Sequence, residues 1–203
     1  MKIICIGRNY TAHAKEMKAE VPSVPIFFMK PDTALLPKKS PFFYPDFTKD
    51  LHYECELVVR IKKLGKNIST RFASDYYDEI GIGIDFTARD LQKECKDKGQ
   101  PWEIAKSFEN SAPISEQFIS KSLLNLNDLN FSLWKNDELV QKGNSKNMLF
   151  SIDTIISYVS QFMTLKIGDL IFTGTPEGVG PVQIGDILTA KIEEETLLKV
   201  RIK

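Results

Sequence analysis

The chain has 203 residues, of which 42% are hydrophobic and 27% are charged. This length predicts one domain of ordinary size over residues 1–203, or one domain with a small appendage, because it suffices to bury a full core. Its 27 basic and 27 acidic residues balance, which gives no reason to expect nucleic acid or an acidic membrane as a partner. The three cysteines form no C-x-x-C pair, and neither a signal peptide nor an apolar run of the ~20 residues that span a membrane is evident. We therefore expect a cytoplasmic protein with reduced thiols.

The first quarter of the chain alternates apolar runs with polar connections. Residues 2–7 predict a strand, and residues 11–18 predict a short helix with Asn9 as its N-cap. This helix lacks an apolar stripe, and prolines follow it in the loop up to residue 25, so residues 10–25 are expected to form a mobile lid. Residues 25–31 predict a second strand, and the proline-rich stretch 36–48 is irregular.

Two apolar strands with acids inside them follow, over residues 51–61 and 81–86. Glu54 and Glu56 lie two apart, so on a pleated strand their carboxylates point to one face. Asp85 interrupts the second strand. Three neighbouring carboxylates repel one another unless a cation compensates them, and oxygen ligands favour Mg²⁺ or Mn²⁺, with Ca²⁺ as an alternative, over Zn²⁺. The competing interpretation is that the two glutamates line the solvated face of a half-buried strand.

The rest of the chain adds helices and short strands. Thr87 and Asp90 have the spacing of a capping box and open a helix over residues 88–98. Residues 131–140 predict a hairpin, and Ser151 caps an amphipathic helix that ends at Met163. A strand runs into a glycine-rich loop over residues 168–181, before two closing strands at 186–192 and 196–202. Many short strands with few helices and no regular βαβ alternation predict a β-rich α+β fold.

Some polar residues in these elements could carry chemistry. His13 and Glu16 share one helix face, so the carboxylate could polarise the histidine as a general base, although an exposed pair of this kind is also a common surface contact. Lys106 interrupts an apolar segment and could offset a carboxylate or a developing enolate, or it could extend its amine to solvent. The turn that contains Thr175 could present N–H groups and hydroxyls to an anion, or be a tight turn only.

The order of these motifs resembles the fumarylacetoacetate hydrolase family over nearly the whole chain. The motifs that carry the resemblance are Gly7-Arg8-Asn9-Tyr10 with His13 and Glu16, Lys30-Pro31, Glu54-x-Glu56, Asp85-x-x-x-Arg89-Asp90, Lys106-Ser107-Phe108 and Thr173-Gly174-Thr175-Pro176-x-Gly178-Val179-Gly180. They are most similar to the short, single-domain branch that contains acylpyruvate hydrolases and oxaloacetate decarboxylases. Gln92, Lys98-Gly99 and Trp102 also resemble that branch.

The resemblance implies a roll of mixed β-sheets, a homodimer, and a site for a small 2-oxo acid. It implies that Glu54, Glu56 and Asp85 hold a divalent metal and that His13 and Glu16 form the lid pair. The family's anion- and enolate-binding positions correspond to Arg8, Lys30, Arg89, Gln92, Lys106 and Thr175. His13, Glu16 and Lys106 are then the expected catalytic residues.

The expected activity is metal-dependent C–C hydrolysis of acylpyruvates together with decarboxylation of oxaloacetate, since both reactions pass through the enolate of pyruvate. An alternative keeps the same site but transfers a proton at an enolate. The protein would then be an isomerase of 2-hydroxyhepta-2,4-diene-1,7-dioate or a decarboxylase of 5-oxopent-3-ene-1,2,5-tricarboxylate in aromatic catabolism. A third hypothesis, from another class, is a non-catalytic protein that binds dicarboxylates through a metal.

Overall fold

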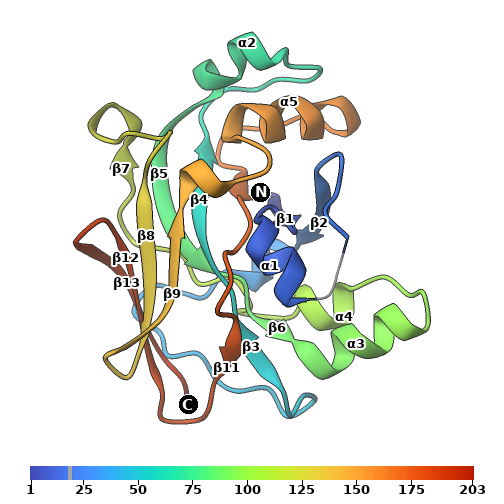
Figure 1. Ribbon diagram of the computed structural model, residues 1–203, viewed down its shortest axis with the longest axis vertical. Coiled ribbons are helices and arrows are strands. Elements are labelled where there is room, and N and C mark those ends of the chain that lie inside the picture. Colours follow the sequence, from blue (N-terminus) through green and yellow to red (C-terminus); the bar gives the residue numbers. More distant parts are fainter. Residues whose placement is uncertain (18–19) are drawn as a thin grey trace.

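The computed structural model describes residues 1–17 and 20–203 (Figure 1). The helices are α1 (Thr11–Glu16), α2 (Thr70–Ala73), α3 (Arg89–Asp97), α4 (Glu103–Lys106) and α5 (Ile152–Phe162), with short 3₁₀ turns at Asp32–Ala34, Ser74–Tyr76, Lys121–Leu123 and Ser145–Asn147. The expected end of the first helix, Lys18, lies outside the described residues, and the described part of that helix ends at Glu16.

The strands form sheets of six, three and four members. They are β1 (Ile3–Gly7), β2 (Ile26–Lys30), β3 (Leu51–Tyr53), β4 (Cys55–Ile61), β5 (Tyr77–Ile84), β6 (Thr87–Ala88), β7 (Ile119–Ser120), β8 (Asn130–Lys135), β9 (Glu138–Asn144), β10 (Leu170–Phe172), β11 (Gly180–Pro181), β12 (Ile187–Ile192) and β13 (Glu195–Arg201). The orders are β2-β1-β10-β4-β5-β7, β11-β3-β6 and β13-β12-β8-β9. This mixture of sheets with few helices confirms the β-rich α+β prediction.

The central strands of the six-stranded sheet are buried on both faces, and their alternating side chains divide between two apolar clusters. Leu57 and Val59 of β4 belong to the larger cluster, which also contains Leu133 and Leu188 of the four-stranded sheet. Val58 points the other way, into a smaller cluster. Glu54 and Glu56 have the same parity as Val58, so strand geometry places them on that second face.

Two local predictions from turn and cap chemistry are confirmed. Asn136 and Asp137 connect β8 to β9, and both have positive φ, as a two-residue hairpin turn that matches the strand twist requires. The Ser151 hydroxyl accepts a hydrogen bond from the Thr154 N–H at 3.2 Å and caps α5.

Two predicted caps are wrong, because the polar side chains bond elsewhere. Tyr10, not Asn9, occupies the N-cap position of α1. Asn9 instead donates to the carbonyl oxygens of Phe150 and Thr173 at 3.0 and 2.8 Å. Thr87 and Asp90 form no capping box, and Asp90 accepts a hydrogen bond from the Thr48 hydroxyl at 2.6 Å.

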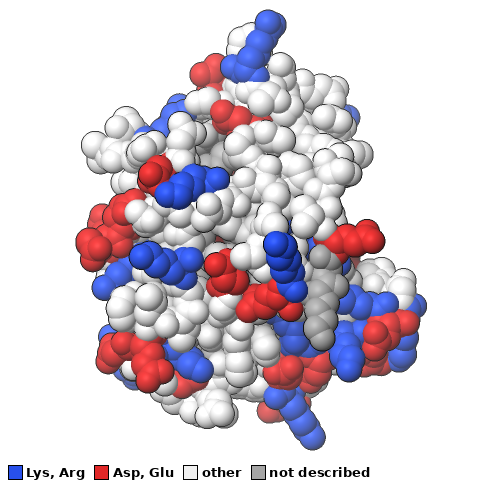
Figure 2. All heavy atoms as spheres, viewed as in Figure 1, with Lys and Arg blue, Asp and Glu red and all other residues white. Residues whose placement is uncertain are grey.

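The surface carries both signs of charge. On the face that Figure 2 shows, Lys and Arg alternate with Asp and Glu, as the balanced composition predicts. Among the helices of residues 1–17 and 20–203, none has the length and apolar character needed to cross a membrane. The thiols of Cys5, Cys55 and Cys95 are free and buried.

Candidate active site

Glu54, Glu56 and Asp85 converge in the interior. A carboxylate oxygen of each lies within 4.8 Å of those of the other two, and the residues are 6%, 1% and 1% exposed. The solvated-face interpretation of the two glutamates is therefore wrong. We refer to these three residues as the acidic triad.

Antiparallel pairing of β4 with β5 explains how the acidic triad forms. Cys55 pairs with Ile84, and beyond this pair the N–H of Asp85 donates to the carbonyl oxygen of Glu54 at 2.8 Å. Asp85 thus follows the end of β5 instead of interrupting the strand. On β5, Gly83 lies opposite Glu56 and leaves space for the Phe172 ring, since a Cβ there would lie 2.7 Å from it.

Three cations lie against the acidic triad. The buried ammonium of Lys106, on α4, lies 2.9 Å from Glu54 Oε2 and 2.8 Å from Asp85 Oδ2. Arg89 Nη2 lies 2.7 Å from Glu54 Oε1, and Lys30 Nζ lies 2.8 Å from Asp85 Oδ1. Lys106 therefore does not extend to solvent; it neutralises buried carboxylates, which would otherwise be costly.

These cations and the burial of the site shift the pKa values of Glu54 and Glu56 in opposite directions. Burial raises the pKa of Glu54, but the charges of Lys106 and Arg89 outweigh it and hold the pKa well below its usual range. Burial lowers the pKa of Lys106, yet Asp85 and Glu54 raise it above its usual value. Glu56 has the opposite balance from Glu54: burial and the charges of Asp85 and Glu54 raise its pKa well above the usual value. Glu56 is thus the acid whose charge the surrounding cations compensate least.

The donor set of the acidic triad fits a divalent metal. All three residues offer carboxylate oxygen, which suits Mg²⁺ and Mn²⁺. Asp85 Oδ1 is buried and accepts no hydrogen bond within residues 1–17 and 20–203, although Lys30 is near it. A divalent cation would supply the positive charge that is needed beside Glu56 to compensate its carboxylate.

His13 and Glu16, which the family resemblance assigns to a lid, contact each other on α1. His13 Nδ1 lies 3.1 Å from Glu16 Oε2, and His13 is 6% exposed. The second oxygen of Glu16 accepts a hydrogen bond from the Gly178 N–H at 3.1 Å, so the pair is tied to the glycine-rich loop. If Nδ1 carries the proton that is shared with Glu16, Nε2 of His13 is left free to accept one.

The glycine-rich loop binds the acidic triad directly. The Gly174 N–H donates to Glu56 Oε2 at 2.6 Å, and the Thr175 hydroxyl donates to the carbonyl oxygen of Cys55 at 2.9 Å. Gln141 of β9, which the sequence analysis missed, donates to the Thr175 hydroxyl and accepts from the Cys55 N–H, each at 2.9 Å. Its one sequence signal is an amide next to a predicted hairpin, which is too common to indicate a site.

A cavity of about 40 Å³ lies over the acidic triad. It brings together residues from all the segments that the sequence analysis selected, although Glu16 and Lys30 are not in its wall. The selected residues that line it are Arg8, His13, Glu54, Glu56, Asp85, Arg89, Gln92, Lys106 and Thr175. Met17, Phe28, Lys96 and Trp102 also line it and were not predicted as site residues.

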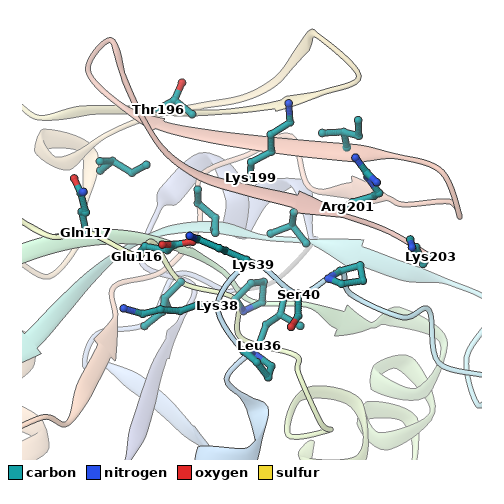
Figure 3. A pocket seen from close by; sticks show the side chains of 18 residues that line it. Leu36, Lys38, Lys39, Ser40, Glu116, Gln117, Thr196, Lys199, Arg201 and Lys203 are labelled. Atoms are coloured by element: carbon teal, nitrogen blue, oxygen red, sulfur yellow. The ribbon is translucent and has the colours of Figure 1, made fainter.

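The most voluminous of the cavities described, about 640 Å³, lies elsewhere (Figure 3). It is bounded by the loop of residues 36–41, residues 113–117 and strand β13. Lys38, Lys39, Lys199, Arg201 and Lys203 make much of its wall cationic. It shares no lining residue with the cavity over the acidic triad, so it is separate from the candidate site.

The chain is similar to known proteins along its whole length. The family model described as "Fumarylacetoacetate (FAA) hydrolase C-terminal" matches residues 2–203. A Bos taurus protein named oxaloacetate tautomerase FAHD1, mitochondrial, is 44% identical over 201 residues, which cover 99% of this chain and 91% of the relative. A Dictyostelium discoideum protein named oxaloacetate decarboxylase, mitochondrial, is 40% identical over 192 residues, 94% of this chain and 88% of the relative.

Solved structures agree with the sequence comparisons. Fumarylpyruvate hydrolase from Pseudomonas aeruginosa, solved in complex with Mn²⁺ and pyruvate, has a TM-score of 0.93 at 37% identity and covers 100% of this chain and 89% of its own. A 5-carboxymethyl-2-hydroxymuconate delta-isomerase from Mycobacterium smegmatis has a TM-score of 0.87 at 32% identity, with 99% of this chain and 78% of its own covered. By its family match and these similarities, the chain belongs to the fumarylacetoacetate hydrolase family.

Proposed function

We propose that this protein is a divalent-metal-dependent enzyme that hydrolyses acylpyruvates and decarboxylates oxaloacetate. The observation that carries the proposal is the convergence of a buried acidic triad, the buried ammonium of Lys106 and the His13–Glu16 pair around one cavity. The relatives support it, since their names include an oxaloacetate decarboxylase and a fumarylpyruvate hydrolase.

Mg²⁺ or Mn²⁺ is the proposed cofactor, held by Glu54, Glu56 and Asp85. When bound, the metal supplies Lewis-acid polarisation of the 2-oxo group and attracts the negative charge that develops there. The P. aeruginosa structure with Mn²⁺ and pyruvate supports this choice. Residues 1–203 would act as one catalytic domain with residues 10–25 as its lid, in a cytoplasmic homodimer. The mitochondrial location in the names of the relatives describes those proteins.

In hydrolysis, His13 takes a proton from water, and the oxygen of that water attacks the acyl carbonyl carbon. Glu16 accepts the other ring N–H, which orients the imidazole and stabilises its charged form. The bond between the acyl carbon and C3 of the pyruvate unit then breaks, and its electron pair forms pyruvate enolate. The Lys106 ammonium lines the cavity where this charge develops and stabilises it. Protonation of the enolate carbon completes the products, a carboxylic acid and pyruvate.

Decarboxylation of oxaloacetate reaches the same enolate by loss of CO₂ and needs no attacking water. The test therefore compares acetylpyruvate and oxaloacetate with Mg²⁺ for the wild type and His13→Ala. We expect His13→Ala to lose hydrolysis by about 10² to 10⁴-fold, the usual contribution of a general base, and to retain part of the decarboxylation.

The matched control is His52→Ala, because His52 is the other of the two histidines, pairs with Asp50 at 2.8 Å and does not line the cavity. Equal loss of both activities in His13→Ala would refute the water-activating role. A wild type that turns over neither substrate would refute the proposed activity. Binding of oxalate with metal but without turnover would instead indicate a non-catalytic dicarboxylate-binding protein.

Proton transfer at an enolate is a second candidate, favoured by the tautomerase and isomerase names among the relatives. It uses the same polarised 2-oxo group and a base, without C–C cleavage. Rapid keto–enol interconversion of oxaloacetate or isomerisation of a 2-hydroxy-dienedioate, with inert acylpyruvates, would identify it.

A further inference from the structure

The cavity over the acidic triad is too small for a whole substrate of the proposed reaction. Its volume of about 40 Å³ holds about three water molecules. A 2-oxo acid whose carboxylate end lies at the acidic triad therefore extends beyond this cavity, and its acyl group lies in a neighbouring space.

A second hollow adjoins the cavity through a shared wall. It has a volume of about 310 Å³ and lies between β2 and the segment that joins α3 to α4, which meet where Phe28 contacts Trp102. Its wall includes Phe27, Phe28, Met29, Pro101, Trp102 and Glu103, and we call it the aromatic groove. Phe28 and Trp102 also line the cavity over the acidic triad, so their rings separate the two spaces.

The shared wall consists of two aromatic rings, each with a lysine ammonium group close to it. The rings of Phe28 and Trp102 meet edge to face, with centroids 6.1 Å apart. Lys106 Nζ lies 5.1 Å from the centroid of Phe28, and Lys96 Nζ lies 5.5 Å from that of Trp102. The proposed catalytic lysine is therefore one ring away from the aromatic groove. This ring pair is the boundary that the tail of a substrate would follow from the acidic triad to the groove.

The lining of the aromatic groove determines which acyl groups fit. Apolar atoms form most of its exposed wall, and the one charged side chain in it is the carboxylate of Glu103. A carboxylate at the far end of a substrate would be repelled by the carboxylate of Glu103. Binding of an aliphatic or aryl end in the groove would be favourable, because it removes apolar surface from water.

We infer that the aromatic groove is the subsite for the acyl group, and that the enzyme prefers 2-oxo acids with an apolar tail over those with a distal carboxylate. This inference rests on the proposed function, since it extends the same site. Trp102 acts as a specificity residue that contacts the tail. Each methylene group that is fully removed from water raises the affinity roughly fourfold. Because the groove is half open, we expect a whole butyl chain to raise the affinity about tenfold relative to a ligand without a tail.

Binding of unreactive probes tests the inference without turnover. Oxamate mimics the 2-oxo acid end, N-butyl oxamate adds an apolar tail, and N-(3-carboxypropyl) oxamate adds a tail of similar length that ends in a carboxylate. Each is titrated in the presence of Mg²⁺ by calorimetry into the wild type, Trp102→Ala and Trp134→Ala. The Trp134 variant is the matched control, because Trp134 is the other of the two tryptophans and lies on β8.

We expect N-butyl oxamate to bind the wild type and Trp134→Ala at least about tenfold more tightly than oxamate. The carboxylate-ended probe should gain less than threefold over oxamate, on the order of one methylene group at most. In Trp102→Ala the butyl advantage, which is the ratio of the Kd of oxamate to the Kd of N-butyl oxamate in the same variant, should fall below about threefold. With Trp134→Phe, Trp102 is the remaining tryptophan, so the butyl tail should also change the intrinsic fluorescence.

The outcomes separate this inference from the proposed function. Turnover of oxaloacetate or acetylpyruvate without a butyl advantage would refute the subsite and leave the function standing. A butyl advantage that depends on Trp102, with no turnover, would support the subsite and refute the function. Failure of oxamate to bind would refute both. A further outcome is that the wild type shows no butyl advantage and Trp102→Ala changes the oligomeric mass. This result would indicate that a second copy of the chain covers the groove, and it would refute the subsite.

Discussion

Replacement of Lys106 by methionine tests whether this ammonium group holds the acidic triad together. In the wild type, Lys106 contacts both Glu54 and Asp85, and Arg89 and Lys30 contact one each. Lys106→Met keeps the approximate volume of the side chain but removes the ammonium group that the two buried carboxylates share. Removing one partner of a buried ion pair costs about 3 to 5 kcal/mol, and we expect a loss of this size in the free energy of unfolding without metal.

The assay is urea unfolding followed by tryptophan fluorescence, with a chelator and then with saturating Mg²⁺ or Mn²⁺. The metal should stabilise Lys106→Met more than the wild type, because it replaces the missing positive charge. Lys98→Met is the control, because Lys98 pairs with Glu94 at the exposed C-terminal end of α3, where loss of the pair should leave the unfolding midpoint nearly unchanged. An unfolding midpoint of Lys106→Met equal to that of the wild type would refute this account of the buried charges.

Two further predictions concern stability. Gly174→Ala should cost about 1 to 3 kcal/mol and weaken metal binding, because Gly174 has φ +98° and a Cβ would lie 2.6 Å from Asn9 Cβ. Gly185→Ala, at φ +100° in open space, isolates the backbone strain, and equal urea midpoints for the two variants would contradict the clash. Burial raises the pKa of Asp90, but hydrogen bonds from backbone N–H groups and the Thr48 hydroxyl hold it below 3.8. Because the folded-state pKa is the lower one, Asp90 stabilises the protein above pH 3.8 and loses this effect as the pH falls through the folded-state pKa. Asp90→Asn should therefore lower Tm by about 2 to 4 °C at pH 7, with a smaller difference at pH 3, and a pH-independent difference would contradict this.

The acids of the triad could be found from the sequence because each stands beside apolar strand residues. A buried carboxylate in such a context needs a partner, and this requirement is visible without coordinates. Strand periodicity also predicted that the side chains of Glu54 and Glu56 point to the same face of the strand. The three carboxylates do meet in the structure, whereas their role as metal ligands stays a prediction.

Other parts of the site depend on packing that leaves no local signal. Asn9 looks like a helix cap, yet its side chain joins Phe150 and Thr173, from segments more than 140 positions away. Gln141 supports Thr175 from a hairpin strand in which exposed and buried residues are mixed, so its burial appears only when the sheets are packed. The wall formed by Phe28 and Trp102 likewise requires two distant segments to meet.

The place of β10 in the six-stranded sheet has a consequence for how the chain folds during synthesis. β10 lies between β1 and β4, and its Leu170 pairs with Ile3 across most of the sequence. Until residues 170–172 have left the ribosome, the β1–β2 pair has no place in the sheet, and the edges of β1 and β4 are unpaired. Long-range pairing of this kind is slow, and unpaired edges favour aggregation. A nascent chain of this protein therefore completes its six-stranded sheet only after residues 170–172 have left the ribosome.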